Sequence, residues 1–352
     1  MDSSPPCVSF IGIVDFSQEA RWIYMTDSVA DLLGYEPHEL LGRPSLELVH
    51  PDEFPRVKQM HYDTIQQDKA AVLAYLRMRH KDPYKGYILC GISRTVVHNV
   101  LVGSVSFASP GAKALHNAST AQEIEVVTPS ALNFQFRRWN DPSPMPPSPP
   151  LRSRPLPSSP SSRSSSEERS PSPEHRQEPI TFDHLPNKSF RTAFILDRFS
   201  VNCTISYCSN DLLLSTTSAI GRSFFDFVAK KDEDIVRSWI DVIKSWGVNE
   251  RGQPSDGGFG FGRFGLLIDG RDSIGRVPEP PPSRHRHGSS ASGGHTSKSR
   301  ASKSRPAPTS RSRPPTHSPV TDSNSPQISV DAIFSAHSDG LMVILRRAPL
   351  PS

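Results

Sequence analysis

The sequence of 352 residues has few cysteines and no long apolar run. Its four cysteines, Cys7, Cys90, Cys203 and Cys208, are far fewer than a disulfide scaffold uses, which favours a reducing compartment. No apolar run approaches the roughly 18 residues that a membrane-spanning helix needs, so we expect no membrane segment. The net charge of +4 is too small to give the whole chain a basic field for nucleic acid.

Hydrophobic residues are also scarce, at 35%, whereas the 35 prolines are about twice the usual share of roughly 5%. Such a deficit cannot be spread evenly over well-packed domains, so some segments must lack a core. Two tracts rich in Pro, Ser and Arg account for it, and we expect a disordered linker over 110–187 and a disordered insertion over 273–326. Residues 111–140 contain EIEVV and NFQFRRW, which fit short strands or adhesive peptides, and their role stays open.

Three segments, 8–109, 188–272 and 327–348, have the patterns of folded protein. In the first, two strand patterns (SFIGIVD and WIYMTD) precede helical patterns, and three strand patterns rich in β-branched residues follow. Strands, then helices, then more strands predict an α+β fold with an antiparallel sheet.

A run of short motifs in residues 24–52 resembles the PAS-domain family. The matching residues are Tyr24, Leu33, Gly34, Tyr35, Pro37, Leu40, Gly42, Arg43, His50, Pro51 and Asp52. The resemblance implies a five-stranded antiparallel sheet with several helices on one face. The chain is also similar, in a general way, to the fungal white-collar regulators. It departs from them because no cysteine follows Gly42-Arg43 to form a flavin adduct, and because the sequence has no zinc finger.

A second PAS-like pattern lies downstream. Gly221-Arg222 is followed by Val228 at the same spacing at which Gly42-Arg43 is followed by Val49. Residues 188–272 supply only three strand patterns, so the implied sheet lacks two. Residues 327–348 hold two apolar segments around an Asp-Gly pair, which is a strong hairpin signal. We therefore expect these residues to complete the second domain across the long insertion, since loop closure grows only slowly with length.

His61 is the one candidate cofactor ligand in the sequence. The helix expected after Asp52 places Phe54, Val57, His61 and Ile65 along one face. Some PAS sensors supply a haem ligand from this helix, but a core histidine satisfied by a hydrogen bond is the favoured interpretation. We expect no bound cofactor, with haem or a non-covalent flavin as the alternative.

The two Pro-rich tracts carry candidate regulatory sites. Within these tracts, seven serines precede proline: Ser143, Ser148, Ser159, Ser170, Ser172, Ser318 and Ser325. Phosphorylation by proline-directed kinases would add nearly two negative charges at each, although a Pro/Ser-rich linker also matches this short motif by chance. Residues 298–313 fit a nuclear import signal, a patch that attracts nucleic acid, or solvated linker charge. A nuclear or cytoplasmic location is expected, with the nucleus favoured.

No phosphate-binding loop, nucleophile elbow or kinase motif is present, so we expect no enzyme. Because the sequence has no zinc finger, and no basic helix-loop-helix precedes the first PAS-like segment, we also expect no direct sequence-specific DNA binding. The expected function is PAS-mediated protein–protein interaction in intracellular signalling or transcriptional regulation. The expected partner is another PAS-containing protein or a second copy, bound through exposed sheet faces and edges. The alternative is a PAS sensor that binds haem or another ligand between its sheet and helices.

Overall fold

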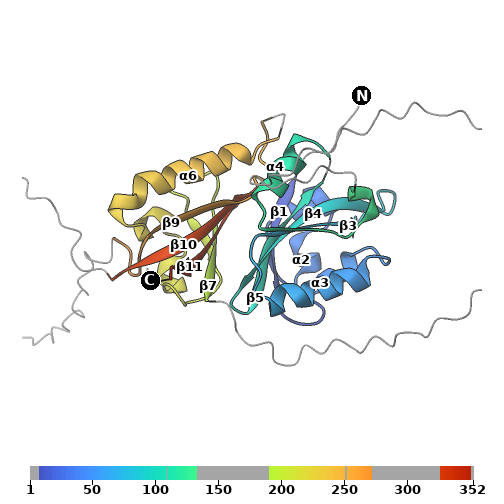
Figure 1. Ribbon diagram of the computed structural model, residues 1–352, viewed down its shortest axis with the longest axis horizontal. Helices are drawn as coiled ribbons and strands as arrows, with labels where there is room; N and C mark the ends of the chain where they lie inside the picture. The colour runs from blue at the N-terminus through green and yellow to red at the C-terminus, as the bar shows by residue number, and fades with distance from the viewer. Residues whose placement is uncertain (1–7, 109, 133–189, 250–251, 272–325, 350–352) are drawn as a thin grey trace, which may run out of the picture.

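The computed structural model describes residues 8–108, 110–132, 190–249, 252–271 and 326–349. These residues form two units, each built on one β-sheet. We call residues 8–132 the first domain, and residues 190–271 with 326–349 the second domain. The two lie side by side, with their sheets toward each other and all of their helices on the outside except the one at residues 112–120, which lies where the domains meet (Figure 1).

The first domain contains a six-stranded sheet with the order β2-β1-β5-β4-β3-β6. The five predicted strands are antiparallel to their neighbours, whereas the sixth, β6, pairs in parallel with β3. The prediction of five strands is therefore wrong by one edge strand. The bounds are β1 Ser9–Asp15, β2 Trp22–Met25, β3 Val72–Arg79, β4 Tyr87–Val97, β5 Val100–Phe107 and β6 Glu123–Val126.

Helices cover one face of this sheet. They are α1 Val29–Leu33, α2 Pro37–Leu40, the 3₁₀ helix η1 Ser45–Leu48 and α3 Phe54–Gln66. Gly34 ends α1 at φ +78°, and Gly42 has the same φ after α2, a conformation that favours glycine. These two turns let three short helical segments wrap a core that includes Phe10, Leu33 and Leu76.

The opposite face of the first sheet is also covered. Residues 110–132, which the sequence assigned to a disordered linker, contain α4 Ala112–Thr120, β6 and the 3₁₀ helix η2 Pro129–Ala131. Ala114 and Ala118 of α4 pack in one apolar cluster with Leu73 and Tyr75 of β3. The linker prediction fails here because small alanine side chains let α4 lie close to an apolar sheet face. The rest of that predicted linker lies outside the described residues.

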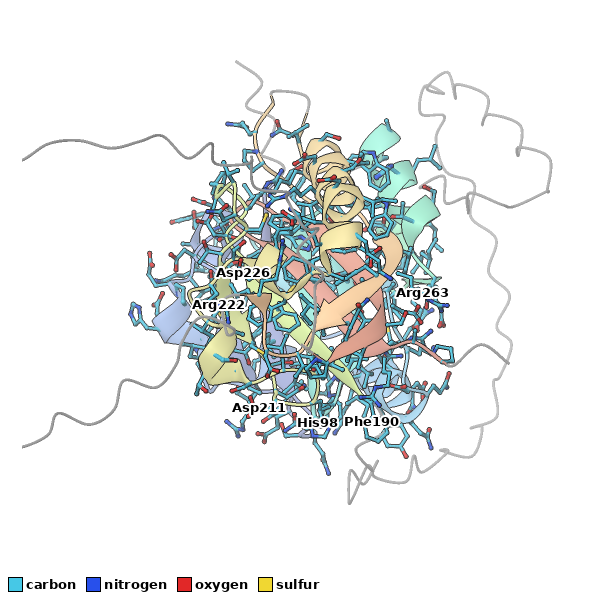
Figure 2. The ribbon with its side chains drawn as sticks, turned by 90° about the vertical axis from the view of Figure 1, so that its left-hand side faces the viewer. His98, Phe190, Asp211, Arg222, Asp226 and Arg263 are labelled. Atoms are coloured by element: carbon cyan, nitrogen blue, oxygen red, sulfur yellow. The ribbon has the colours of Figure 1, made fainter. Side chains whose placement is uncertain are left out.

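The second domain has a five-stranded antiparallel sheet with the order β8-β7-β11-β10-β9. Figure 2, turned toward this domain, shows Arg222 and Asp226 near its surface and Arg263 on the edge strand β9. The strands are β7 Arg191–Leu196, β8 Ile205–Cys208, β9 Gly260–Leu267, β10 Gln327–Ala336 and β11 Leu341–Arg347. The helices are α5 Thr216–Ala219, η3 Phe224–Phe227, η4 Lys230–Asp232 and α6 Glu233–Trp246, of which η3 and η4 are 3₁₀ helices.

Strands β10 and β11 lie in this sheet, where the sequence pattern required two more strands. Strand β11 pairs with β7 on one side and with β10 on the other, so it is central. Strand β10 pairs with β9, and Ile268 N donates to Pro326 O at 3.2 Å. The two ends of the chain around residues 272–325 are therefore adjacent, which is the geometry of a hairpin with a long connection.

The second sheet repeats the first in register as well as in order. Ile13 pairs with Tyr24 in the hairpin β1–β2, and Ile195 pairs with Tyr207 in the hairpin β7–β8. In each hairpin the register shifts at the next residue of the first strand. Because pairing and irregularity coincide, the positions of the two domains can be matched one to one along these strands.

Candidate functional site

The motif residues in 24–52 mostly shape the chain and do not converge on one site. Gly34 lies close to the His80 ring, and a Cβ there would come within 2.8 Å of it. The His50 ring accepts a hydrogen bond from Asp52 N at 3.2 Å and lies 4.5 Å from the Tyr87 ring. Leu33, Tyr35 and Leu40 are buried in the core, Pro37 is the first residue of α2, and Arg43 pairs with Glu47 at the surface. Tyr24 is the exception, because it lies between the domains.

The first candidate site is the contact between the two sheets, which we call the central interface. Its apolar part comprises Ile11, Ile13, Val97, Val100, Val102, Ala193, Ile195, Met342 and Ile344, with Tyr24 and Tyr207 against it. Equivalent positions of the two sheets contribute to this cluster, since Ile13 pairs with Val102 in the first sheet and Ile195 with Met342 in the second. The expectation that these sheet faces are exposed is therefore wrong, because each covers the other.

Polar contacts border this apolar part on two sides. Arg191 Nη1 pairs with Asp68 Oδ1 at 2.7 Å and donates to Val96 O at 2.9 Å, although Arg191 is only 7% exposed. On the other side Ser28 N donates to Asp339 Oδ2 at 2.8 Å. Buried charge-assisted bonds need well-aligned partners to offset desolvation, so they fix the relative orientation of the two sheets.

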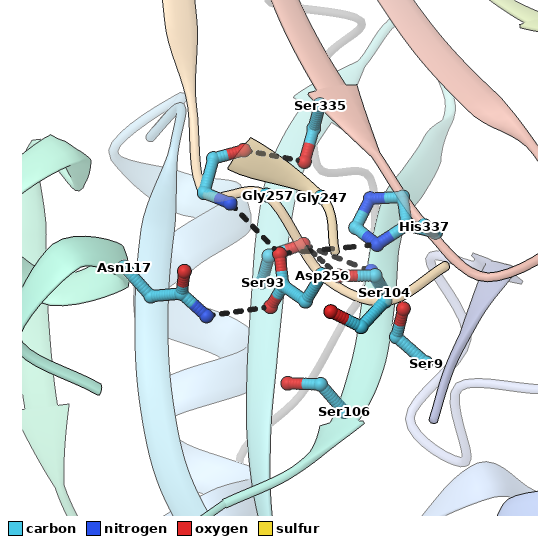
Figure 3. Close-up of polar contacts among 12 residues, drawn as sticks. Ser9, Ser93, Ser104, Ser106, Asn117, Gly247, Asp256, Gly257, Ser335 and His337 are labelled. Atoms are coloured by element: carbon cyan, nitrogen blue, oxygen red, sulfur yellow. Dashed lines mark hydrogen bonds and ion pairs between the residues drawn. The ribbon is translucent and has the colours of Figure 1, made fainter. Parts of the chain in front are cut away.

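Serine, histidine and aspartate side chains meet in a buried polar layer of the interface (Figure 3). Asn117 Nδ2 donates to Asp256 Oδ2 at 3.0 Å, and His337 Nδ1 lies 4.0 Å from Asp256 Oδ1. Burial lowers the pKa of His337, which holds the imidazole neutral. No side chain of the described residues hydrogen-bonds to either ring nitrogen of His337, so no serine here has the base contact of a nucleophile. The Asn117–Asp256 contact of this layer joins the first domain to the second.

The second candidate site is a cavity of about 80 Å³ between the sheet and helices of the first domain. Its walls are largely apolar, with Trp22, Leu46, Val57 and Met78 among them. Its polar side chains include His61 and Arg94, from α3 and β4. Cys90, also on the inner face of β4, is buried, and burial raises the pKa of its thiol to about 12.

His61 lies where the sequence placed it, on the buried side of α3 with Val57 and Ile65, whereas Phe54 is 39% exposed. Burial, followed by the nearby Arg94 charge, lowers the pKa of His61 to about 4, so the ring is neutral at pH 7. A neutral imidazole suits a metal ligand. The cavity, however, is far below the roughly 300–1,000 Å³ of ligand pockets, so the surrounding residues do not fit a haem or a flavin.

Arg94 is the residue that the sequence analysis missed. It lies on the inner face of β4 in a register where Cys90 and Ile92 belong to the apolar core. The sequence did contain a signal, because Arg94 occupies a position at which the alternation along this strand predicts a buried apolar side chain. Burial lowers the pKa of Arg94 to about 10, while Glu125 and Glu123 oppose the shift, so the guanidinium stays charged at neutral pH.

The third candidate site is an apolar surface on α6. Ile235, Trp239, Val242 and Trp246 recur at helical spacing on one side of the helix, and we call them the α6 stripe. Ile235 is 50% exposed, Val242 42% and Trp246 38%. Trp239 is partly buried and packs on Phe334. Trp246 contacts the His116 ring of α4 at 4.9 Å, so the stripe reaches the first domain.

Several predicted features lie outside these sites. All seven candidate phosphoserines and the basic segment 298–313 lie outside the described residues. Across the ranges that the structure describes, no three His, Cys, Asp or Glu side chains are grouped to hold a metal ion. The helices in those ranges are all too short or too polar to cross a membrane.

Residues 22–86 match the family model described as "PAS fold", and this range contains all eleven motif residues. The chain is similar to the PAS domain of the Cronobacter turicensis RpfR quorum-sensing receptor, solved in complex with BDSF. That match has 16% identity and a TM-score of 0.26, and it covers 29% of this chain and 94% of the other. It is also similar to Drosophila melanogaster Cycle PAS-B with bound ethylene glycol, at 18% identity and a TM-score of 0.24, covering 28% and 99%.

A third similar structure is the N-terminal domain of a diguanylate cyclase with a PAS/PAC sensor from Marinobacter aquaeolei. Its identity is 15% and its TM-score 0.24, and the match covers 28% of this chain and 92% of the other. No curated protein matches the chain.

Proposed function

We propose that this chain, whose residues 22–86 match the PAS fold, is a signalling protein that acts by binding another protein. In this proposal it has no catalytic or DNA-binding part of its own. The central interface supports the proposal, because two PAS-like sheets pair there through equivalent residues. The sheet faces of this chain therefore have the apolar, self-complementary surface that association requires.

Because the sheet faces are already paired within the chain, a further partner must bind elsewhere. The α6 stripe is the surface we assign to it. A row of exposed apolar side chains on one helix is typical of a protein contact, since water favours its burial. The partner is a second copy of this chain or another PAS-containing protein, which would bury Ile235 and Val242 against its own apolar surface.

Sedimentation velocity of the full chain over a range of concentrations tests this assignment. We expect the wild-type chain to dimerise and the double variant Ile235→Asp/Val242→Asp to stay monomeric, because two charges would have to be desolvated in the contact. Asp241→Lys is the matched control, since it changes the charge by two units on an exposed face of the same helix that lies about 100° around the axis from Val242. A double variant that dimerises like the wild type would exclude the α6 stripe.

A second candidate function, small-molecule sensing, is favoured by the cavity of the first domain. A largely apolar space with His61 and Arg94 in its wall has the composition of a small ligand site. The corresponding test is a ligand-dependent rise in the melting temperature of the full chain. This test is independent of sedimentation, so each function can fail alone.

The finer parts of the proposal concern cellular role. We propose a role in transcriptional regulation of the kind that the white-collar resemblance implies, with a nuclear location and phosphorylation in the Pro-rich tracts. Its support is the motif run of residues 24–52 and the Ser-Pro and basic sequences. Mass spectrometry of the chain from its own cells should detect phosphate on at least some of the seven serines, Ser143 to Ser325.

A further inference from the structure

Strand β9 has an unpaired backbone edge at the rim of the second sheet. Gly265 directs its backbone away from β10, because its N–H donates to Asp232 Oδ2 and its C=O accepts from Ala229 N, both at 2.8 Å. Backbone direction alternates along a strand, so the N–H and C=O groups of Phe261 and Arg263 point the same way as those of Gly265. Within the described ranges, no group hydrogen-bonds to the backbone of either residue on that side. Figure 2 shows Arg263 at this edge.

Comparable strands of both sheets are covered by the chain itself. Along β8, Ile205 N donates to Arg222 O at 2.9 Å, and β6 pairs with β3, which holds the place in the first sheet that β9 holds in the second. Proteins blunt an exposed edge with proline, a bulge, a charge or a covering segment. Residues 260–264 contain no proline and pair with β10 in unbroken register, and their one charged side chain, Arg263, is paired with Asp331 on the sheet face. An edge of this kind is a template for another strand.

The α6 stripe lies above this edge, on the helix side of the sheet. The Trp239 ring lies so close to Gly262 of β9 that a Cβ at Gly262 would overlap it. The opposite flank of α6 faces β8, since Lys244 Nζ lies 3.4 Å from Cys203 Sγ, just before that strand. The flank that carries the stripe therefore points toward the free edge of β9. A strand added there would bury its helix-side side chains against the stripe.

On the other face of the sheet, the edge opens into a groove of about 700 Å³ between the domains. Phe261, which is 51% exposed, lines this groove together with Arg263 and Arg346. The two arginines share one carboxylate, because Arg263 Nε lies 2.7 Å from Asp331 Oδ1 and Arg346 Nε lies 3.2 Å from Oδ2. The other charged side chains of the groove wall are paired with each other. The groove therefore has an excess of positive charge, which suits an acidic ligand.

The first domain shows which chemistry suits a covering strand in this fold. β6 alternates acidic and apolar side chains in the order Glu123, Ile124, Glu125 and Val126, and it pairs with β3 along these residues. Its two glutamates lie 2.7 and 3.7 Å from the Lys69 ammonium. A strand with acidic side chains toward a cation and apolar side chains on its other face thus already covers one sheet of this chain. The two faces beside β9 offer the same pair of environments, one cationic and one apolar.

We propose that the free edge of β9 binds an extended segment of a partner protein as an added strand, with apolar side chains on the α6 stripe and acidic side chains beside Arg263 and Arg346. This inference rests on the proposed function, which is binding of another protein, and names the part of the partner that binds. The unpaired backbone groups supply the affinity, and the two flanking surfaces select the sequence.

The length of the free edge excludes one occupant. Ala229 covers β9 at Gly265, and at the other end Thr120 Oγ1 accepts from Phe259 N at 3.0 Å. About five residues fit between these covers, a length of roughly 17 Å. The β9 strand of a second copy has the same covers at both of its ends, and these would collide with the covers of the first copy. The partner therefore contributes a segment without such covers, at a terminus or in a loop.

A heptapeptide in which valine and glutamate alternate is the probe for this site, with binding to the full chain followed by fluorescence anisotropy. It should bind, and a peptide with lysine in place of each glutamate should bind at least about tenfold more weakly. Alternate N–H groups of an added strand face β9, so N-methylation of one alternate set of residues should abolish binding and N-methylation of the other set should not. Loss of binding with neither set would contradict strand pairing.

Two variants at one position separate the backbone from the side chain. Arg263→Pro removes the outward N–H and leaves the pairing with β10, which does not use that group. Arg263→Ala is the matched control, because it loses the same guanidinium and keeps the N–H. The peptide should bind Arg263→Pro at least about tenfold more weakly than Arg263→Ala. In the wild-type chain, saturating peptide should slow hydrogen exchange at the amides of Phe261 and Arg263 by at least about tenfold.

Equal binding by Arg263→Pro and Arg263→Ala, or unchanged exchange at Phe261 and Arg263 in the peptide complex, would overturn the proposal. If Arg263→Pro does not fold, the exchange measurement and the N-methylated peptides decide alone. Sedimentation of Ile235→Asp/Val242→Asp judges the α6 stripe separately. A chain that dimerises through the stripe but binds no heptapeptide would refute the added strand and leave the proposed function standing.

Discussion

The rings of Tyr24 and Tyr207 lie against each other across the central interface, with centroids 4.8 Å apart and planes inclined by 32°. The two residues are equivalent, because each pairs with the isoleucine at the same place in its own hairpin. Burial raises the pKa of both phenols, so both stay protonated at neutral pH. A residue that meets its own counterpart marks the contact as isologous, the arrangement found in two-fold symmetric dimers.

The tyrosine contact should appear as a coupling between two substitutions. Tyr24→Leu and Tyr207→Leu should each lower the free energy of unfolding, and the double variant should lose less than the sum. A coupling of about 0.5–1.5 kcal/mol is expected for such an aromatic pair. Urea unfolding of the four chains measures it. Tyr84→Leu is the control, since Tyr84 is fully exposed and should show no coupling with Tyr207. Strict additivity of Tyr24→Leu and Tyr207→Leu would contradict the contact.

The first domain should fold alone, and residues 110–132 should stabilise it. A fragment of residues 8–132 keeps α4 and β6 over Leu73 and Tyr75, whereas residues 8–108 expose both side chains. Exposing two large apolar side chains lowers the free energy of unfolding by about 3–6 kcal/mol. Circular dichroism during urea unfolding compares the fragments. Equal midpoints would show that α4 and β6 add nothing to this fold.

The second domain should depend on residues 327–349. Truncation after Pro326 removes β10 and β11, including the strand that lies between β7 and β10, so residues 190–271 should lose cooperative unfolding. Replacing residues 277–324 by a short Gly/Ser turn should leave the melting transition intact, because Ile268 and Pro326 are hydrogen-bonded across the gap. Calorimetry of both variants decides this. Should the truncated chain keep the wild-type transition, the split domain is disproved.

Acid should destabilise the first domain through His61. Its pKa is about 4 in the folded state and about 6.5 when unfolded, so the unfolded chain binds the proton first. The contribution of the neutral His61 ring to the free energy of unfolding is fully present above pH 6.5. It is lost as the pH falls toward 4, by about 1.4 kcal/mol per pH unit. Urea unfolding of residues 8–132 between pH 7 and 5 should show this slope. His61→Leu should reduce this slope by the contribution of one proton, about 1.4 kcal/mol per pH unit. An unchanged slope would contradict the burial of a neutral His61 ring.

Local signals in the sequence predicted the first domain well. Gly34 and Gly42 adopt the positive φ that the expected turns require, and the Asp-Gly pair at 339–340 lies in the turn between β10 and β11. The run in residues 22–86 matches the PAS fold. These features depend on a few neighbouring residues, so they can be read without knowledge of the distant chain.

The central interface depends on residues far apart in the sequence, and no local rule gives their pairing. A signal was nevertheless present. Strands with one face in water alternate apolar and polar residues, yet FIGIV in β1, VLAYL in β3 and LMVIL in β11 are continuously apolar. Such runs indicate strands buried on both faces. The lack of a hydrogen-bond acceptor for Nε and Nη2 of Arg94 was beyond prediction, because it depends on which residues of other strands and helices surround the guanidinium.

The central place of β11 sets an order for assembly during synthesis. The ribosome adds about 5–20 residues per second, so roughly 4–16 seconds separate the emergence of β9 from that of β11. Throughout that interval the first domain can be complete while its outer sheet face, including Ile11 and Ile13, stays uncovered. During this interval the nascent chain exposes two surfaces that can bind other polypeptides. One is that sheet face, and the other is the unpaired edge of β7. A chaperone that binds apolar segments would act during this interval. The interval ends when Met342 and Ile344 are synthesised and cover the face.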